Sequence, residues 1–184
     1  MGDTAIHEQT APSALRRAVL EQAVQSVLAR FGAERIERSE FRDNLRLHVP
    51  RELAYEVLAH LKHACGFDML IDITAVDYLN YPRARDRFAV IWSLLHTESG
   101  ARLYVKTYLN EPELSVPTVF DLWKAADWLE REVYDMFGIR FVGHPNLRRI
   151  LLPEEFTAYP LRKDYPLRGR GERHNFRKLT REQS

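Results

Sequence analysis

Two apolar runs joined by a short turn constrain the fold of this chain more than any other feature. Residues 88–97 and 101–109 are rich in Val, Ile, Leu and aromatic residues, and Glu98, Ser99 and Gly100 separate them. Such runs around a glycine-containing turn predict an antiparallel β-hairpin. In the second arm, one face carries Leu103, Val105, Thr107 and Leu109, and the other carries Arg102, Tyr104, Lys106 and Tyr108.

The remaining chain mixes helical and strand patterns. Apolar residues at helical spacing predict helices over 20–31, 53–61 and 118–137, the last capped by Thr118 and ended by Gly138. Residues 45–49 alternate as in a half-buried strand, and residues 67–78 predict a mostly buried strand. Hairpins mixed with helices favour an α+β class over a doubly wound sheet. We expect a two-layer domain with a mixed, largely antiparallel sheet packed on helices, plus an extended C-terminal tail.

The charge of the chain is divided unevenly along its length. The formal net charge is +1, yet residues 1–138 carry −5 and residues 139–184 carry +6, together with four of the nine prolines. This division predicts a compact α+β body over 12–138 and a basic, proline-rich tail over 139–184. Proline excludes a long helix from the tail. Because we expect no local partner strand for it, the tail should become ordered only on another surface.

Several classes of protein are excluded by what the sequence lacks. It contains no GxGxxG, no GxxxxGK[ST] and no GxSxG motif, which disfavours a dinucleotide enzyme, an NTPase and a serine hydrolase. The single cysteine, Cys65, rules out an internal disulfide and a self-contained iron–sulfur cluster, and we expect it to be structural. The longest uncharged apolar run, 88–97, is too short for a membrane span, and Met1–Ala11 does not resemble a secretory signal. We therefore expect a soluble protein of a reducing compartment.

Three potential metal ligands share one helix face. Glu56, His60 and His63 lie at i, i+4 and i+7, a spacing that could ligate zinc with a further ligand from elsewhere. The same three residues would also form an ordinary solvated face opposite the apolar side of the helix. The second interpretation is the expected one.

The most charged segment lies at the end of the predicted helix 118–137. Asp127, Arg131 and Asp135 are spaced at i, i+4 and i+8, so we expect the arginine to pair with both carboxylates. Glu130 and Glu132 point to different faces, which makes them unsuitable as a general acid and base pair. The arginines and aromatic residues of the tail would suit an acidic protein surface or a nucleic-acid backbone, and composition does not decide between them.

These segments resemble a known family. Glu130-Arg-Glu-Val-Tyr-Asp-Met-Phe-Gly-Ile139, Gly143-His-Pro and Leu147-Arg-Arg-Ile-Leu151 look like the signature of the 30 kDa subunit of respiratory complex I. In bacteria this is the C subunit of NADH–quinone oxidoreductase. Leu161-Arg-Lys-Asp-Tyr-Pro166 and Asp72-Ile-Thr-Ala-Val-Asp-Tyr78 resemble two further family blocks. The resemblance covers about residues 14–167.

The resemblance implies a non-catalytic, structural subunit of the hydrophilic peripheral arm, in a complex that passes electrons from NADH to quinone and translocates protons. A protein of this family carries no cofactor of its own, since FMN, the iron–sulfur clusters and quinone belong to other subunits. Its partners are a 49 kDa-type quinone-site subunit and neighbouring iron–sulfur subunits. It would lie peripherally on the cytoplasmic side of the cell inner membrane. We expect the motif residues to serve packing and docking, with Arg148, Arg149, Arg162 and Lys163 docking on the partner. The full set is Glu130, Arg131, Glu132, Asp135, His144, Pro145, Arg148, Arg149, Arg162, Lys163 and Asp164.

Two alternatives remain open besides a small metalloenzyme built on Glu56, His60 and His63. One is the equivalent subunit of a ferredoxin-dependent or membrane-bound hydrogenase relative of complex I. The other is a nucleic-acid-binding module that uses the basic tail, which would bind RNA or DNA in a strongly salt-dependent way.

Overall fold

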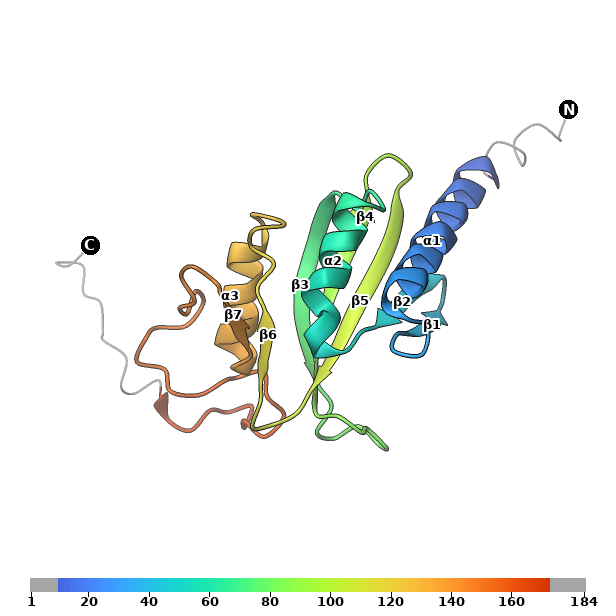
Figure 1. Ribbon diagram of the computed structural model, residues 1–184. Helices are drawn as coiled ribbons and strands as arrows, with labels where there is room; N and C mark the ends of the chain where they lie inside the picture. Colours follow the sequence, from blue (N-terminus) through green and yellow to red (C-terminus); the bar gives the residue numbers. More distant parts are fainter. Residues whose placement is uncertain (1–9, 173–184) are drawn as a thin grey trace, which may run out of the picture.

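The computed structural model describes residues 10–172 (Figure 1). The elements follow the chain as α1 (Thr10–Phe31), β1 (Glu37–Phe41), β2 (Asn44–His48), η1 (Arg51–Leu53), α2 (Ala54–His63), β3 (Met69–Asp77), β4 (Phe88–His96), β5 (Ala101–Leu109), β6 (Ser115–Pro117), α3 (Ala126–Phe137) and β7 (Arg140–Val142). None of the helices in this described part combines the length and apolarity needed to cross a bilayer.

Within residues 10–172 the principal sheet has five strands in the order β1-β2-β5-β4-β3. All neighbouring pairs are antiparallel except β2 and β5, which run parallel. The predicted hairpin is β4–β5, with Trp92 opposite Val105. The α+β class and the mixed, largely antiparallel sheet are therefore confirmed.

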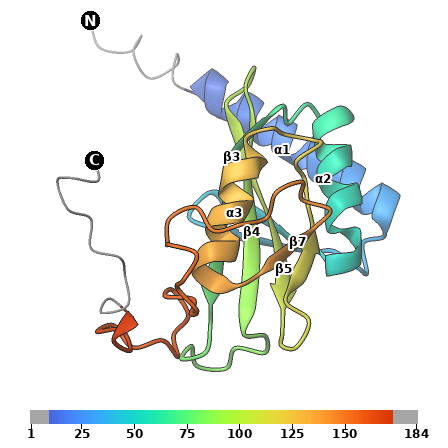
Figure 2. The ribbon, with the colours of Figure 1, turned by 90° about the vertical axis from the view of Figure 1, so that its left-hand side faces the viewer.

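One face of this sheet forms the hydrophobic core. Leu103, Val105 and Thr107 of β5 are fully buried, as their alternation predicts. Helix α1 contacts β5 and α2 on this side of the sheet. Figure 2 shows α2 to one side of the strands. The opposite face of β2 and β5 is polar and aromatic. Its residues are Arg46, His48, Arg102, Tyr104, Lys106 and Tyr108.

Helix α3 packs against β3, the edge strand of the sheet, and the small parallel pair β6–β7 lies beside it (Figure 1). The predicted helix over 118–137 begins only at Ala126. Thr118 does not cap it, because α3 begins eight residues later. The Thr118 hydroxyl instead accepts from the N–H of Phe120 at 3.2 Å and donates to Glu130 at 2.6 Å. The predicted end is correct, since Gly138 closes α3 with a left-handed φ of 76°.

The expectation that the tail has no local partner strand is wrong for its first residues. Strand β7 has a local partner, β6, and Ile139 and Phe141 are buried in the core. The pattern of three residues was too short to be recognised as a strand. Beyond β7 the described tail has no α-helix and no strand, and it runs along α3 (Figure 2). The division of the chain after residue 138 stays a prediction, and residues 173–184 of the tail lie outside the described residues.

Helix α1 is longer than predicted, because it begins at Thr10 rather than near residue 20. Its apolar residues face the sheet only from Leu20 onward, so the hydrophobic pattern marked the buried half alone. Strand β1 was not predicted. Its sequence, Glu-Arg-Ser-Glu-Phe, has mostly exposed side chains and no apolar alternation.

Candidate functional site

Glu130 lies at the centre of the first cluster of motif residues. Its carboxylate is fully buried and accepts hydrogen bonds from the Thr118 hydroxyl at 2.6 Å and from the backbone N–H of Val119 at 2.7 Å. The buried imidazole of His144 lies 4.0 Å away, and its Nε2 is 3.2 Å from the carbonyl of Asp127. The motif thus fastens helix α3 to the segment that precedes it.

Burial disfavours the charged form of Glu130 and raises its pKa to about 7, although the Thr118 and Val119 donors oppose this shift. The negative charges of Asp127 and Asp121 add to the increase. A carboxyl group with such a pKa can hold or release a proton near neutral pH. Its surroundings, however, are packed side chains and backbone.

Asp135 forms the second cluster, which we call the nest. Asp135 Oδ2 accepts three successive backbone N–H groups, those of residues 150, 151 and 152, at 3.0, 2.8 and 2.9 Å. Arg149 Nη1 donates to Asp135 Oδ1 at 2.5 Å, and Arg149 Nη2 donates to the carbonyl of Ala158. Successive N–H groups around one anion form a concave anion site.

The Asp135 side chain is fully buried. Burial disfavours its charged form, but the backbone donors and Arg149 outweigh this cost and lower the pKa of Asp135. The carboxylate is therefore held ionised inside the protein. The Asp135 carboxylate binds Arg149 and the tail backbone, whereas the sequence predicts that it pairs with Arg131 on the same helix.

The predicted Asp127–Arg131–Asp135 pairing is wrong. Arg131 donates to the backbone carbonyls of Arg148 and Arg149, both at 3.2 Å. Arg149, which lies 14 positions later in the chain, forms the ion pair with Asp135 instead. The guanidinium of Arg131 is used by these two carbonyls, and Arg149 supplies the counter-ion that a buried carboxylate needs.

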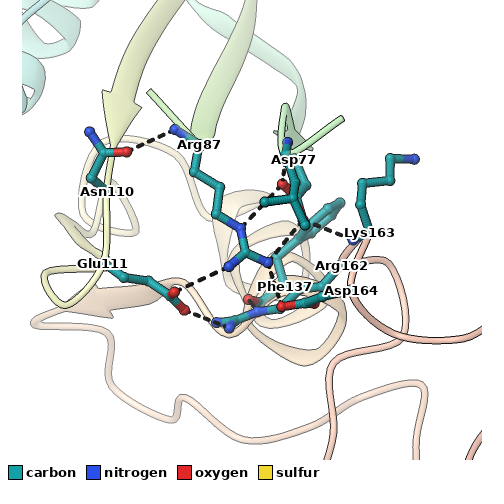
Figure 3. Close-up of polar contacts among 9 residues, drawn as sticks. Asp77, Arg87, Asn110, Glu111, Phe137, Arg162, Lys163 and Asp164 are labelled. Atoms are coloured by element: carbon teal, nitrogen blue, oxygen red, sulfur yellow. Dashed lines mark hydrogen bonds and ion pairs between the residues drawn. The ribbon is translucent and has the colours of Figure 1, made fainter. Parts of the chain in front are cut away.

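The third cluster, which we call the tail clamp, joins the loops at one end of the sheet to the family block 161–166 (Figure 3). It consists of Asp77, Arg87, Glu111, Arg162 and Asp164. Arg87 Nη2 lies 2.7 Å from Asp164 and 3.4 Å from the fully buried Asp77 carboxylate. Glu111 accepts from Arg87 at 3.1 Å and from Arg162 at 2.9 Å. Arg87 of the body and Arg162 of the tail thus share the Glu111 carboxylate.

Backbone and ring contacts complete the tail clamp. Arg162 Nε donates to the carbonyl of Phe137 at 2.6 Å, and its guanidinium stacks on Tyr159 at 4.7 Å. A Cβ at Gly138 would lie 2.6 Å from Tyr159 and 2.8 Å from Arg162. Glycine is therefore required here both for its positive φ and for the close approach of the tail.

The hydrogen bond from Arg87 lowers the pKa of Asp164, so this carboxylate stays ionised at neutral pH. Asp77, Arg87 and Glu111 were not among the predicted site residues. Asp77 lies within the resemblance block 72–78, which is the one sequence signal that could have indicated it.

The remaining motif residues point to solvent. Glu132, Pro145, Arg148 and Lys163 are exposed, while Arg149 and Arg162 are bonded within the chain. Docking on a partner through Arg149 and Arg162 stays a prediction. Two large apolar side chains near these residues are also exposed, Trp128 at 69% and Leu151 at 61%.

The alternative metal site does not assemble in the described part of the chain. His60 Nε2 lies 2.8 Å from the hydroxyl of Ser26, and no three potential ligands converge within residues 10–172. Burial raises the pKa of the Cys65 thiol, which keeps it protonated. The Glu130, Asp135 and Asp77 carboxylates instead accept hydrogen bonds from within the chain, as supports of tertiary structure do. The buried Asp127 Oδ1, 3.4 Å from His144 Nε2, has no hydrogen-bond partner in the described part of the chain.

Comparison with known proteins gives one consistent family. The family described as "Respiratory-chain NADH dehydrogenase, 30 Kd subunit" matches residues 47–171. NADH-quinone oxidoreductase subunit 5 of Thermus thermophilus is 51% identical over 130 residues, which are 67% of this chain and 62% of that protein. The C subunit of NADH-quinone oxidoreductase from Trichlorobacter lovleyi is 43% identical over 150 residues, which are 82% of this chain and 91% of that protein.

Two solved structures have the same fold. A trypsin-resistant fragment of Nqo5 is similar with a TM-score of 0.64 and 41% identity, covering 70% of this chain and 99% of the fragment. A chain of the membrane-bound sulfane sulfur reductase, an archaeal respiratory membrane complex, is similar with a TM-score of 0.68 and 28% identity. That match covers 88% of this chain and 93% of the other.

Proposed function

Because the chain belongs to the family of the 30 kDa subunit of respiratory-chain NADH dehydrogenase, we propose that it is a structural subunit of NADH–quinone oxidoreductase. In this proposal it lies in the peripheral arm of a complex that passes electrons from NADH to quinone. The observation that carries the proposal is the family match over residues 47–171, within which both the nest and the tail clamp lie.

We propose further that the isolated chain is not catalytic and binds no cofactor. Glu130, Asp135 and Asp77 would be candidates for acid–base chemistry, but each is buried and bonded to groups of the same chain. The single cysteine supports the same conclusion, since an iron–sulfur cluster takes four thiolates as a rule. FMN, the clusters and quinone would then be held by other subunits.

The surface next to the nest is the best candidate for docking on a 49 kDa-type subunit and neighbouring iron–sulfur subunits. Arg148 and Leu151 are exposed there, and Trp128 is exposed about two helical turns before Asp135 on α3. Tryptophan and arginine are enriched at the energetically dominant positions of protein interfaces. The nest fixes the backbone of 150–152 and so holds Leu151 in one position. We place the complex, with this chain peripheral, at the cytoplasmic side of the inner membrane.

Purification of the tagged chain from native membranes tests the proposal. We expect it to be recovered with the other peripheral-arm subunits, in a preparation that oxidises NADH with a quinone acceptor. Recovery of the chain alone would contradict the proposal.

A second function is favoured by one observation, the likeness to the sulfane sulfur reductase chain over 88% of this sequence. The equivalent subunit of such a relative would be recovered in a membrane complex too. That preparation would not oxidise NADH, which separates the two outcomes.

A further inference from the structure

An open cavity of about 1060 Å³ lies at the polar face of β2 and β5. It borders the tail clamp, because its lining residues Tyr78 and Asp86 directly adjoin Asp77 and Arg87 in the chain. Side chains of these strands line it, among them His48, Lys106 and Tyr108. Residues 33–37 before and at the start of β1, Val49 and Pro50 after β2, and the loop that follows β3 form the rest of the lining. None of these residues takes part in the nest or the tail clamp.

Lys106 is the central feature of the cavity. It is only 9% exposed, and its ammonium donates to the Tyr78 hydroxyl at 2.6 Å. The same ammonium lies over the rings of Tyr78 at 4.8 Å and Tyr108 at 4.4 Å. No carboxylate within residues 10–172 is at ion-pair distance from it, although a buried cation without a counter-ion is energetically costly.

The neighbouring groups are mostly donors and cations. Because the Tyr78 hydroxyl accepts from Lys106, its own proton remains available to a further acceptor. His48 stacks on Tyr108 and has a buried Nδ1 without a hydrogen-bond partner in the described part of the chain. Burial lowers the pKa of His48, so the ring is neutral at pH 7.

The charge around the cavity is positive. Five basic side chains line it against three carboxylates, and one of these three, Asp86, already accepts from Asn110 at 2.6 Å. The basic residues are Arg35, Arg46, Arg83, Arg85 and Lys106. A group that binds here is therefore expected to be an anion.

The size and walls of the cavity favour a peptide over a free ion. A volume of about 1060 Å³ would hold a drug-sized ligand, so a single small anion would leave most of the cavity unfilled. Tyr78, Tyr81 and Tyr108 line it, and tyrosine and arginine are typical of protein interfaces.

We propose that this cavity binds an acidic segment of another subunit, whose carboxylate pairs with Lys106 and accepts from Tyr78. The aliphatic or aromatic neighbours of that carboxylate pack on Tyr108. The inference rests on the proposed function, because it takes the partner from the same complex. It adds a second docking site, on the sheet face opposite the helices.

Zero-length coupling with a carbodiimide tests the contact directly in the purified complex. The reagent joins an amine to a carboxylate that touches it, so mass spectrometry should find Lys106 linked to an Asp or Glu of another subunit. A link from Lys106 only to Glu34, Glu37 or Asp86 of its own chain, or no link at all, would overturn the proposal.

Substitution supplies a second measurement. Lys106→Gln keeps a donor for Tyr78 and removes the charge, and about tenfold more of the chain should be released from the complex in a salt wash. Arg102→Gln is the matched control, since Arg102 is exposed on the same strand and face but does not line the cavity. Equal release of the two variants would contradict the proposal. If Lys106→Gln does not accumulate, the coupling of the natural chain still decides.

Two different outcomes would reject the proposed function and the acidic-segment site. Recovery of the chain without other subunits would reject the proposed function. Recovery with them, but without a coupled Lys106, would reject the acidic-segment site alone.

Discussion

The guanidinium of Arg87 lies 2.7 Å from the carboxylate of Asp164, a residue 77 positions later in the chain. Arg87 immediately precedes β4, and Asp164 belongs to the described tail (Figure 3). This pair holds the family block 161–166 against the loop that precedes β4. The part of the tail that carries it is thus attached to the body by its own side chains.

Loss of the tail clamp should expose the tail to proteolysis. Arg162→Gln removes the ion pair with Glu111 and the bond to the Phe137 carbonyl, so the tail should open more often. We expect chymotryptic cleavage after Phe156, which is buried in the folded tail and is followed by Thr157, to become about tenfold faster, which corresponds to about 1.4 kcal/mol. Arg148→Gln, which changes an exposed arginine, should leave the rate unchanged.

Neutralising the nest should destabilise the folded chain. Asp135→Asn leaves Arg149 without its counter-ion and puts an amide group among three N–H donors. Removal of one partner of a buried ion pair costs on the order of 3 kcal/mol. Urea denaturation of the purified chain should report this loss. Glu132→Gln, an exposed change on the same helix, should stay within about 0.5 kcal/mol of the natural chain.

The stability of the chain should decrease with rising pH because of Glu130. Its pKa is about 7 in the folded state, above the ordinary value of 4.5, so the folded chain binds the proton more tightly than the unfolded chain. The contribution is complete below pH 4.5 and is lost as the pH rises to about 7. The difference is on the order of 3 kcal/mol.

Denaturation of Glu130→Gln at pH 5 and pH 8 tests this prediction. The amide cannot ionise, so the variant should lose that part of the pH dependence. The other titratable groups near Glu130 are Asp127, Asp121 and His144, and they remain in the variant. A pH profile identical to that of the natural chain would contradict the assignment.

Two truncations should separate the nest from the remaining tail. Deletion of residues 150–184 removes the three N–H donors of Asp135, whereas deletion of 154–184 keeps them. We expect the shorter protein to be the less stable by about 2 kcal/mol or more, because a buried carboxylate then lacks its donors. Both should fail to assemble if the tail docks on the partner. Equal thermal stability would show that the nest does not contribute.

The sequence was informative wherever a local pattern is set by burial. The alternation in 101–109 predicted which side chains of β5 face the helices, since successive residues of a strand point to opposite faces. Gly138 predicted the end of α3 for an equally local reason, its freedom to adopt positive φ. Strand β1 and the start of α1 were missed because their side chains are mostly exposed and carry no hydrophobic period.

The charged motif residues show the limit of such reasoning. Spacing at i, i+4 and i+8 on a helix predicted that Arg131 would bind Asp135, yet Arg149 and three backbone N–H groups occupy that carboxylate. Lys106 was assigned correctly to the polar face of β5, but nothing in the sequence indicated that it would be buried between Tyr78 and Tyr108.

The sequence by itself determined the class of fold, the hairpin, the end of α3 and, through its motifs, the family resemblance. These depend on residue periodicity and on order along the chain. Only the tertiary structure decided which carboxylate each arginine binds and which side of the sheet stays open. Those outcomes depend on groups that are far apart in the chain, such as Asp135 and Arg149, 14 positions apart, and Arg87 and Asp164, 77 positions apart, which packing of the core brings together. Desolvation then favours the partners that satisfy the buried carboxylates.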